Sequence, residues 1–260
     1  GPPFVETPNI DALADRGVLF EQSLTNNPIC TPARTSLMSS LYPHQTGVSW
    51  VHRSPLDGLE DRFEFHDVMR DVGYDRIVNV GKYHIPDISP SEAGFDQHVP
   101  VDDALGADPA SRPHGLSEDD VIRIPGRPNT ILSGVHPNAK ATETHRVVDE
   151  TIDQIEAQPD DDPWFVRMSL NRPHTPVLPP EPYASMYADE VDLPVGGGDE
   201  LADRVPVLSQ WRQHRGFDRF TDEELRLIRQ HYFGLVSFID DQIGRLLDHL
   251  REQGEFEDTL

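Results

Sequence analysis

The sequence predicts an α/β fold in which a mostly parallel sheet is covered by helices on both faces. A β-branched run at residues 76–80 and a mostly apolar run at residues 164–170 have the composition of buried strands. Segments with apolar residues at helical spacing lie before, between and after them. Strands that alternate with helices usually form parallel sheets, because the connecting helices pack on the sheet faces. A chain of 260 residues is long enough to build one such domain with a sizeable core.

The first 40 residues predict two helices that flank a polar loop. Thr7-Pro8 combines a capping residue with proline at the first helical position, so we expect a short helix over about 8–16. Residues 18–20 are apolar and are expected to form a buried strand. Thr31-Pro32 repeats the combination of cap and proline, and the helix that it begins can run to residue 40. Cys30 is therefore predicted to lie at a helix N-terminus.

The middle of the chain predicts polar residues at the end of a strand. Residues 62–72 have helical spacing and precede the strand at 76–80, which ends at Gly81. Lys82 and His84 therefore lie just past the carboxyl end of a strand, where parallel sheets form their sites. Residues 139–157 predict a further helix before the second strand.

The C-terminal region predicts the longest helix. Thr221 and Glu224 have the spacing of a capping box, and one apolar face continues for about eight turns, until Gly254. Asp240 and Asp241 lie within this helix and diverge by about 100°, so we expect a solvated pair rather than metal ligands.

Two ranges, 86–138 and 176–220, are rich in Pro, Gly, Asp and Ser and show little periodicity. We expect them to be long loop excursions that shape a site or are mobile.

Composition excludes several classes of protein. The 46 Asp and Glu residues outnumber the 22 Lys and Arg residues, which gives a net charge of −24 and argues against a nucleic-acid partner. No apolar run approaches the roughly 18 residues that a membrane span needs. With Cys30 as the one cysteine, no internal disulfide can form.

The lysine content is also unusual, because only Lys82 and Lys140 are lysines. An acidic, lysine-poor chain is compatible with a halophilic host and equally with an ordinary acidic surface. A curve of stability against KCl concentration distinguishes the two.

Two pairs of residues form a candidate site. In a helix, Arg34 lies one turn after Cys30 on the same side, and the free N–H groups of a helix N-terminus favour anions. On an extended segment, Lys82 and His84 would point to the same side and could converge on one ligand. Taken alone, each pair has a plainer interpretation: a buried apolar cysteine, a solvated lysine and a histidine at the edge of the core.

Longer motifs around these residues resemble the sulfatase family. Cys30-Thr31-Pro32-Ala33-Arg34 matches that family's Cys-x-Pro-x-Arg core, and the continuation to Gly47 is also similar. Gly81-Lys82-Tyr83-His84 resembles its Gly-Lys-aromatic-His segment, and Arg172-Pro173-His174-Thr175-Pro176 resembles its Pro-His-x-Pro segment. The motifs follow the family's order, and the resemblance extends over nearly the whole chain.

The resemblance implies an alkaline-phosphatase-like fold and the hydrolysis of an organic sulfate monoester. In that family a formylglycine-generating enzyme oxidises the cysteine to formylglycine, whose hydrate attacks sulfur. The resemblance implies that Arg34 stabilises the alkoxide and that Lys82 binds sulfate oxygens. It also implies that His84 assists collapse of the diol and that His174 binds sulfate or protonates the leaving oxygen. The implied substrate is a small-molecule or carbohydrate sulfate ester.

The family also uses a divalent cation, usually calcium, for which formylglycine at position 30 would be one ligand. The family's carboxylate ligands come from a first strand and from a late strand, and neither segment is recognisable within residues 1–260. We therefore expect this chain to be part of an N-terminal catalytic domain, with an incomplete sheet, weak calcium binding and little turnover.

Two other interpretations stay open at this stage. One is a phosphonate monoester or phosphodiester hydrolase of the same superfamily. The other is a non-catalytic acidic binding module with an unmodified thiol.

Overall fold

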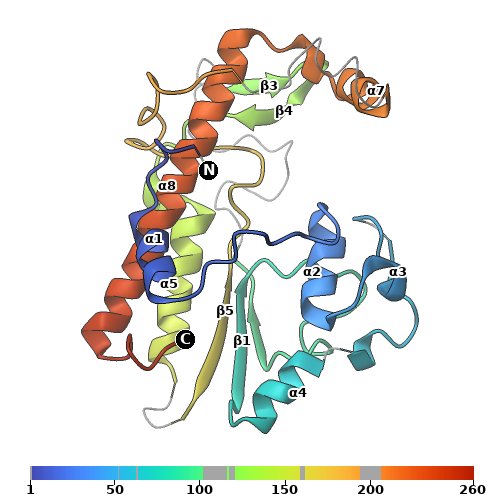
Figure 1. Cartoon of the computed structure of the whole chain (residues 1–260), viewed down its shortest axis with the longest axis vertical. Coiled ribbons are helices and arrows are strands. Elements are labelled where there is room, and N and C mark those ends of the chain that lie inside the picture. The colour runs from blue at the N-terminus through green and yellow to red at the C-terminus, as the bar shows by residue number, and fades with distance from the viewer. Residues whose placement is uncertain are drawn as a thin grey trace. The chain divides into compact units, whose positions relative to one another are not determined.

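The computed structural model describes the chain except for residues 1, 52, 63, 102–115, 117–120, 159–161 and 194–205 (Figure 1). The chain divides into two compact units. Unit 1 comprises residues 1–13, 102–146 and 171–260, and unit 2 comprises residues 14–101 and 147–170.

Unit 2 is built on a three-stranded parallel sheet of order β2-β1-β5. The central strand β1 (Arg76–Gly81) pairs with β2 (Gln97–Val99) on one side and with β5 (Trp164–Ser169) on the other. In this register Gly81 lies opposite Ser169, so β1 and β5 end at the same edge of the sheet. The two predicted strands and their parallel arrangement are confirmed.

Helices cover both faces of this sheet. On one face, α2 (Cys30–Ser39) and α4 (Glu64–Asp71) contribute Met38 and Met69 to a cluster that contains Ile77. On the other face, α5 (Glu143–Glu156) places Val147 against Val78 of β1. Figure 1 shows α2 and α4 on one side of β1 and β5. Unit 2 also contains a short helix α3 (Pro43–Thr46), which contacts α2, and a 3-10 turn η1 (Glu60–Arg62). The predicted α/β architecture is therefore confirmed.

Unit 1 is organised around α8 (Asp222–Gln253), the long helix that the sequence predicts. Its capping box forms as expected, since Thr221 accepts from the Glu224 amide while the Glu224 carboxylate accepts from the Thr221 amide. Leu235 and Phe238 pack against Val177 in the core of the unit. The described residues of this unit also form an antiparallel hairpin, a helix and 3-10 turns: β3 (Ile122–Ile124), β4 (Arg127–Ser133), α7 (Pro206–Arg215), η3 (Ala139–Ala141) and η4 (Phe217–Arg219). No helix in the described ranges combines the length and the apolar character needed to cross a membrane.

The predicted N-terminal helix, α1 (Pro8–Arg16), forms with an unexpected partner. Asp240 of α8 is only 1% exposed, so the prediction of a solvated Asp240–Asp241 pair is wrong for this residue. Its Oδ1 accepts from the Ile10 amide at 2.8 Å, and its Oδ2 accepts from the Asn9 amide at 3.1 Å and from Asn9 Nδ2 at 2.9 Å. A carboxylate at a helix N-terminus is stabilised by the unpaired amides there. Asp241 is exposed, as expected.

Two further expectations differ from the structure. Residues 18–20 form no strand, and the exposed fractions of Val18, Leu19 and Phe20 are 78%, 68% and 77%. The ranges 86–138 and 176–220, parts of which lie outside the described residues, contain β2, β3, β4 and α7. Strands of three to seven residues are too short for periodicity to reveal them.

Candidate active site

Cys30 is the first residue of α2, which confirms its predicted position at a helix N-terminus. The capping residue, Ile29, has an extended backbone and provides no side-chain cap. The first-turn amides of α2 therefore depend on other groups or on a ligand for hydrogen bonds, which favours an anion at this end of the helix. Cys30 itself is half-buried, with Sγ 3.8 Å from Thr31 Oγ1.

Thr31 connects the cysteine loop to the segment that follows β1. Its side chain is fully buried, and Oγ1 lies 3.3 Å from His84 Nε2. His84 is exposed and has a left-handed backbone, with φ at +56°. The extended geometry used to align Lys82 with His84 is therefore wrong, and the contact with Thr31 places the imidazole next to Cys30 instead.

Arg34 lies one turn further along α2, where β1 and β5 end. Its NH1 donates to Ser169 Oγ at 2.9 Å and makes a longer contact of 3.5 Å with the carbonyl oxygen of Lys82. The Lys82 amide in turn donates to the Ser169 carbonyl oxygen at 2.9 Å. Arg34 and the backbone of Lys82 thus meet at Ser169.

Gly81 is required for this close meeting of the strand ends. Its φ is +84°, and a Cβ at this position would lie 2.4 Å from the Ser169 carbonyl oxygen. A side chain would collide with backbone that cannot rotate away, so only glycine fits before Lys82.

A second guanidinium, which sequence reasoning missed, lies near Arg34. Arg167 is two residues before Ser169 on β5, and its NH1 donates to Oδ1 of the fully buried Asn79 at 2.6 Å. Asn79 Nδ2 donates to His98 Nδ1 at 2.9 Å, so a polar row crosses β5, β1 and β2. Burial, and then the charge of Arg34, lower the pKa of Arg167 to about 10, which leaves it protonated at neutral pH.

No carboxylate forms an ion pair with Arg167 anywhere in the described part of the chain. A partly buried cation without an anionic partner is costly, and it raises the positive potential around the C-terminal ends of the strands. The sequence signal that could have revealed it is an arginine inside an otherwise apolar strand.

His174 lies in unit 1 and is exposed. Its Nδ1 is 2.7 Å from the Thr175 carbonyl oxygen, which can only accept, so Nδ1 donates this hydrogen bond. Arg172 donates to the carbonyl oxygens of His174 and Pro176 at 2.9 and 2.6 Å and thereby holds this loop.

Comparison with known proteins decides the family. The family model described as Sulfatase matches residues 1–260. The chain belongs to the sulfatase family. The arylsulfatase of Clostridium perfringens (strain 13 / Type A) is 28% identical over 296 residues, which cover 100% of this chain and 57% of that protein. The multifunctional alkaline phosphatase superfamily protein PehA of Trinickia caryophylli is 28% identical over 295 residues, with 99% of this chain and 56% of that protein covered.

A solved structure confirms the fold of this sulfatase-family chain. The phosphonate monoester hydrolase SpPMH from Silicibacter pomeroyi matches with a TM-score of 0.73 at 23% identity, over 98% of this chain and 56% of that one. The expected alkaline-phosphatase-like fold is therefore confirmed. The chain spans about half the length of the curated relatives that it matches.

The structure thus brings four of the five predicted site residues of this sulfatase-family chain into unit 2: Cys30, Arg34, Lys82 and His84. It does not assemble a metal site from them. Within the described ranges, no group of three or more His, Cys, Asp or Glu side chains could hold a metal ion. These residues do not fit a complete calcium site.

Proposed function

We propose that this chain forms the nucleophile side of a site that hydrolyses organic sulfate monoesters. The observation that carries the proposal is the position of Cys30 at the start of α2, beside the network of Thr31, His84 and Arg34. A sulfate monoester is a tetrahedral anion, which suits helix amides and guanidinium groups. Membership of the sulfatase family supports the same chemistry.

The nucleophile in this proposal is formylglycine, which a formylglycine-generating enzyme makes from Cys30. The hydrated aldehyde carries two hydroxyl groups on one carbon. One oxygen, after losing its proton, attacks sulfur, and the S–O bond to the alcohol breaks. The second hydroxyl then loses its proton, the C=O bond re-forms, and the C–O bond to sulfate breaks. Sulfate leaves and water hydrates the aldehyde again, so the cycle is closed.

The surrounding residues take roles that their chemistry allows. Arg34 stabilises the attacking alkoxide, and the charge of Arg167 nearby adds to the same field. Lys82 binds sulfate oxygens. His84 hydrogen-bonds the diol and accepts the proton that is lost when it collapses. His174 binds sulfate or protonates the departing alcohol oxygen.

We also propose that the complete protein binds one divalent cation, calcium by preference, with formylglycine at position 30 among its ligands. The substrate is a small-molecule or carbohydrate sulfate ester.

The strongest alternative is the hydrolysis of phosphonate monoesters or phosphodiesters. It is favoured by the match to PehA, whose name describes a multifunctional protein, and by the similar shape of phosphoryl and sulfuryl groups. The presence of both Lys82 and His84 favours sulfate. A binding module with an unmodified thiol is the third possibility.

Rate assays on the product of the complete gene, made together with the formylglycine-generating enzyme, separate these functions. An aryl sulfate and an aryl phosphonate monoester with the same leaving group are compared. We expect the larger kcat/KM for the sulfate, complete loss in Cys30→Ala, and a large loss in Lys82→Ala. Lys140→Ala is the matched control, because Lys140 is the second lysine and is exposed. A preference for the phosphonate, or no turnover by modified protein, would contradict the proposal.

A further inference from the structure

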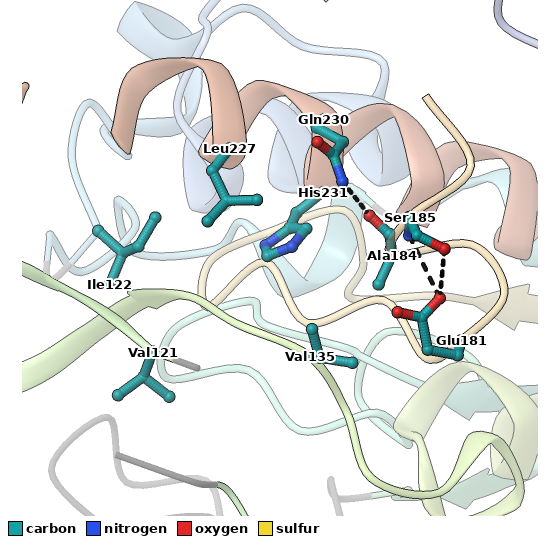
Figure 2. A pocket seen from close by; sticks show the side chains of 9 residues that line it. All are labelled: Val121, Ile122, Val135, Glu181, Ala184, Ser185, Leu227, Gln230 and His231. Atoms are coloured by element: carbon teal, nitrogen blue, oxygen red, sulfur yellow. Dashed lines mark hydrogen bonds between the residues drawn. The ribbon is translucent and has the colours of Figure 1, made fainter. Parts of the chain in front are cut away.

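Unit 1 contains a pocket of about 290 Å³ that the proposed hydrolytic site does not use (Figure 2). Four side chains form the apolar wall of the pocket. Val121 and Ile122 lie at the start of the β3–β4 hairpin, Val135 lies in the segment after the hairpin, and Leu227 lies on α8. Two ionisable side chains, His231 and Glu181, also line it. Small-ligand sites usually combine a mostly apolar wall with a few polar groups in this way.

His231 presents a hydrogen-bond acceptor to the pocket. The residue is 3% exposed, and its Nδ1 lies 2.8 Å from Ser133 Oγ, which also donates to the Val177 carbonyl oxygen at 3.1 Å. A hydroxyl has one proton, so both contacts form together only when His231 Nδ1 carries a proton and donates it to Ser133. Nε2 then keeps its lone pair, and no group in the described ranges hydrogen-bonds to it. In Figure 2 the ring projects from α8 into the lined space.

This acceptor is maintained at neutral pH. Burial lowers the pKa of His231 to about 4, although the charge of Glu181 acts in the opposite direction. The imidazole is therefore neutral, and a neutral nitrogen that lines a pocket without a donor favours a ligand that supplies one.

Glu181 presents a second acceptor. Its Oε2 accepts from the Ser185 hydroxyl at 2.8 Å and from the Ser185 amide at 3.3 Å. Its Oε1 accepts no hydrogen bond from the part of the chain that the structure describes. Ser185 thus fixes the carboxylate at the edge of the pocket while one oxygen stays available.

These groups select one class of ligand. An anion would be repelled by the Glu181 carboxylate, and a hydrocarbon would leave both acceptors unpaired. A small organic ammonium ion has N–H donors for Glu181 Oε1 and His231 Nε2 and an apolar body for the aliphatic wall. We propose that this pocket binds a small primary amine in its ammonium form. The proposal stands on unit 1 alone and does not depend on the proposed hydrolysis.

Calorimetric titration of the 260-residue chain with three probes tests the ligand class. Benzylammonium chloride, benzyl alcohol and sodium benzoate have the same ring and differ in charge. We expect saturable binding of benzylammonium to one site, binding of the alcohol that is weaker by about tenfold or more, and none of benzoate. Absence of saturable benzylammonium binding, or equal binding of benzoate, would overturn the proposal.

Three variants test the location. Glu181→Gln keeps the shape of the side chain and removes its charge, so benzylammonium binding should weaken by about tenfold. Glu252→Gln is the matched control, because it removes the same charge from an exposed position near the end of α8 and should leave binding unchanged. Leu227→Trp fills the pocket from a helix position that is 36% exposed, so the fold should persist while binding is lost. If Glu181→Gln binds as well as Glu252→Gln, or if Leu227→Trp binds normally, the pocket is not the site.

Discussion

Replacing Gly81 with alanine tests whether the close approach of β1 and β5 holds the candidate active site together. At φ +84° an alanine is strained by about 1–2 kcal/mol. Its Cβ would also lie 2.4 Å from the Ser169 carbonyl oxygen and 3.2 Å from Val147 Cγ2. That carbonyl accepts from the Lys82 amide at 2.9 Å, so it cannot move without loosening the strand ends. Overpacking of this kind costs a further 1–3 kcal/mol or so.

The control for this substitution is Gly58→Ala. Gly58 has nearly the same φ, +80°, but an added Cβ would meet no atom within 4 Å. The backbone strain and the effect on the unfolded chain are shared by the two variants, so their difference isolates the collision.

Urea unfolding of the 260-residue chain should show Gly81→Ala to be less stable than Gly58→Ala by about 1–3 kcal/mol. In the complete protein, kcat should also fall for Gly81→Ala alone, because Ser169 positions Arg34. Equal unfolding free energies for the two variants would show that the Cβ of residue 81 meets no such obstacle.

Three other predictions concern stability and metal binding. Asp240→Ala should destabilise the chain by about 2–4 kcal/mol in urea unfolding, because three N–H donors lose a buried carboxylate. The control, Asp241→Ala, removes an exposed carboxylate and should change stability by less than about 0.5 kcal/mol. Equal effects of the two substitutions would count against the capping role of Asp240. Burial lowers the pKa of His66 to about 4, so its neutral ring stabilises the fold fully above about pH 6.5, and up to about 3 kcal/mol is lost as the pH falls toward 4. Unfolding curves of the wild type and His66→Leu against pH should therefore diverge on acidification, and parallel curves would contradict this. Calorimetric titration of the 260-residue chain with CaCl2 should show no tight stoichiometric binding, because its described ranges hold no group of three ligands; tight binding would overturn that expectation.

The elements that the sequence predicted well are those with local signals. Proline after Thr7 marked the start of α1, and the Thr221–Glu224 capping box marked the start of α8. Thr31-Pro32 indicated α2 only approximately, because the helix begins at Cys30 and its capping residue is Ile29 rather than Thr31. Mostly apolar runs marked β1 and β5, because a strand covered on both faces has little polar alternation.

The features that the sequence could not predict depend on partners far along the chain. Asp240 caps α1 from about 230 residues away, which no local spacing can indicate. The row of Arg167, Asn79 and His98 exists only because three strands pair in one register. The contact between His84 and Thr31 likewise joins residues 53 positions apart.

The apolar run at residues 18–20 is a further case in which local sequence does not reveal the packing partner. Apolar composition predicts a preference for burial but not the surface that satisfies it. These side chains are largely exposed in the structure.

Mass spectrometry of the peptide that contains residue 30 shows whether Cys30 is the precursor of an aldehyde nucleophile. The protein is produced from the complete gene in cells that also make the formylglycine-generating enzyme. We predict that the peptide carries an aldehyde, which a hydrazine reagent converts to a hydrazone. An intact thiol at position 30, in cells that fully convert a control substrate of the same enzyme, would contradict the account.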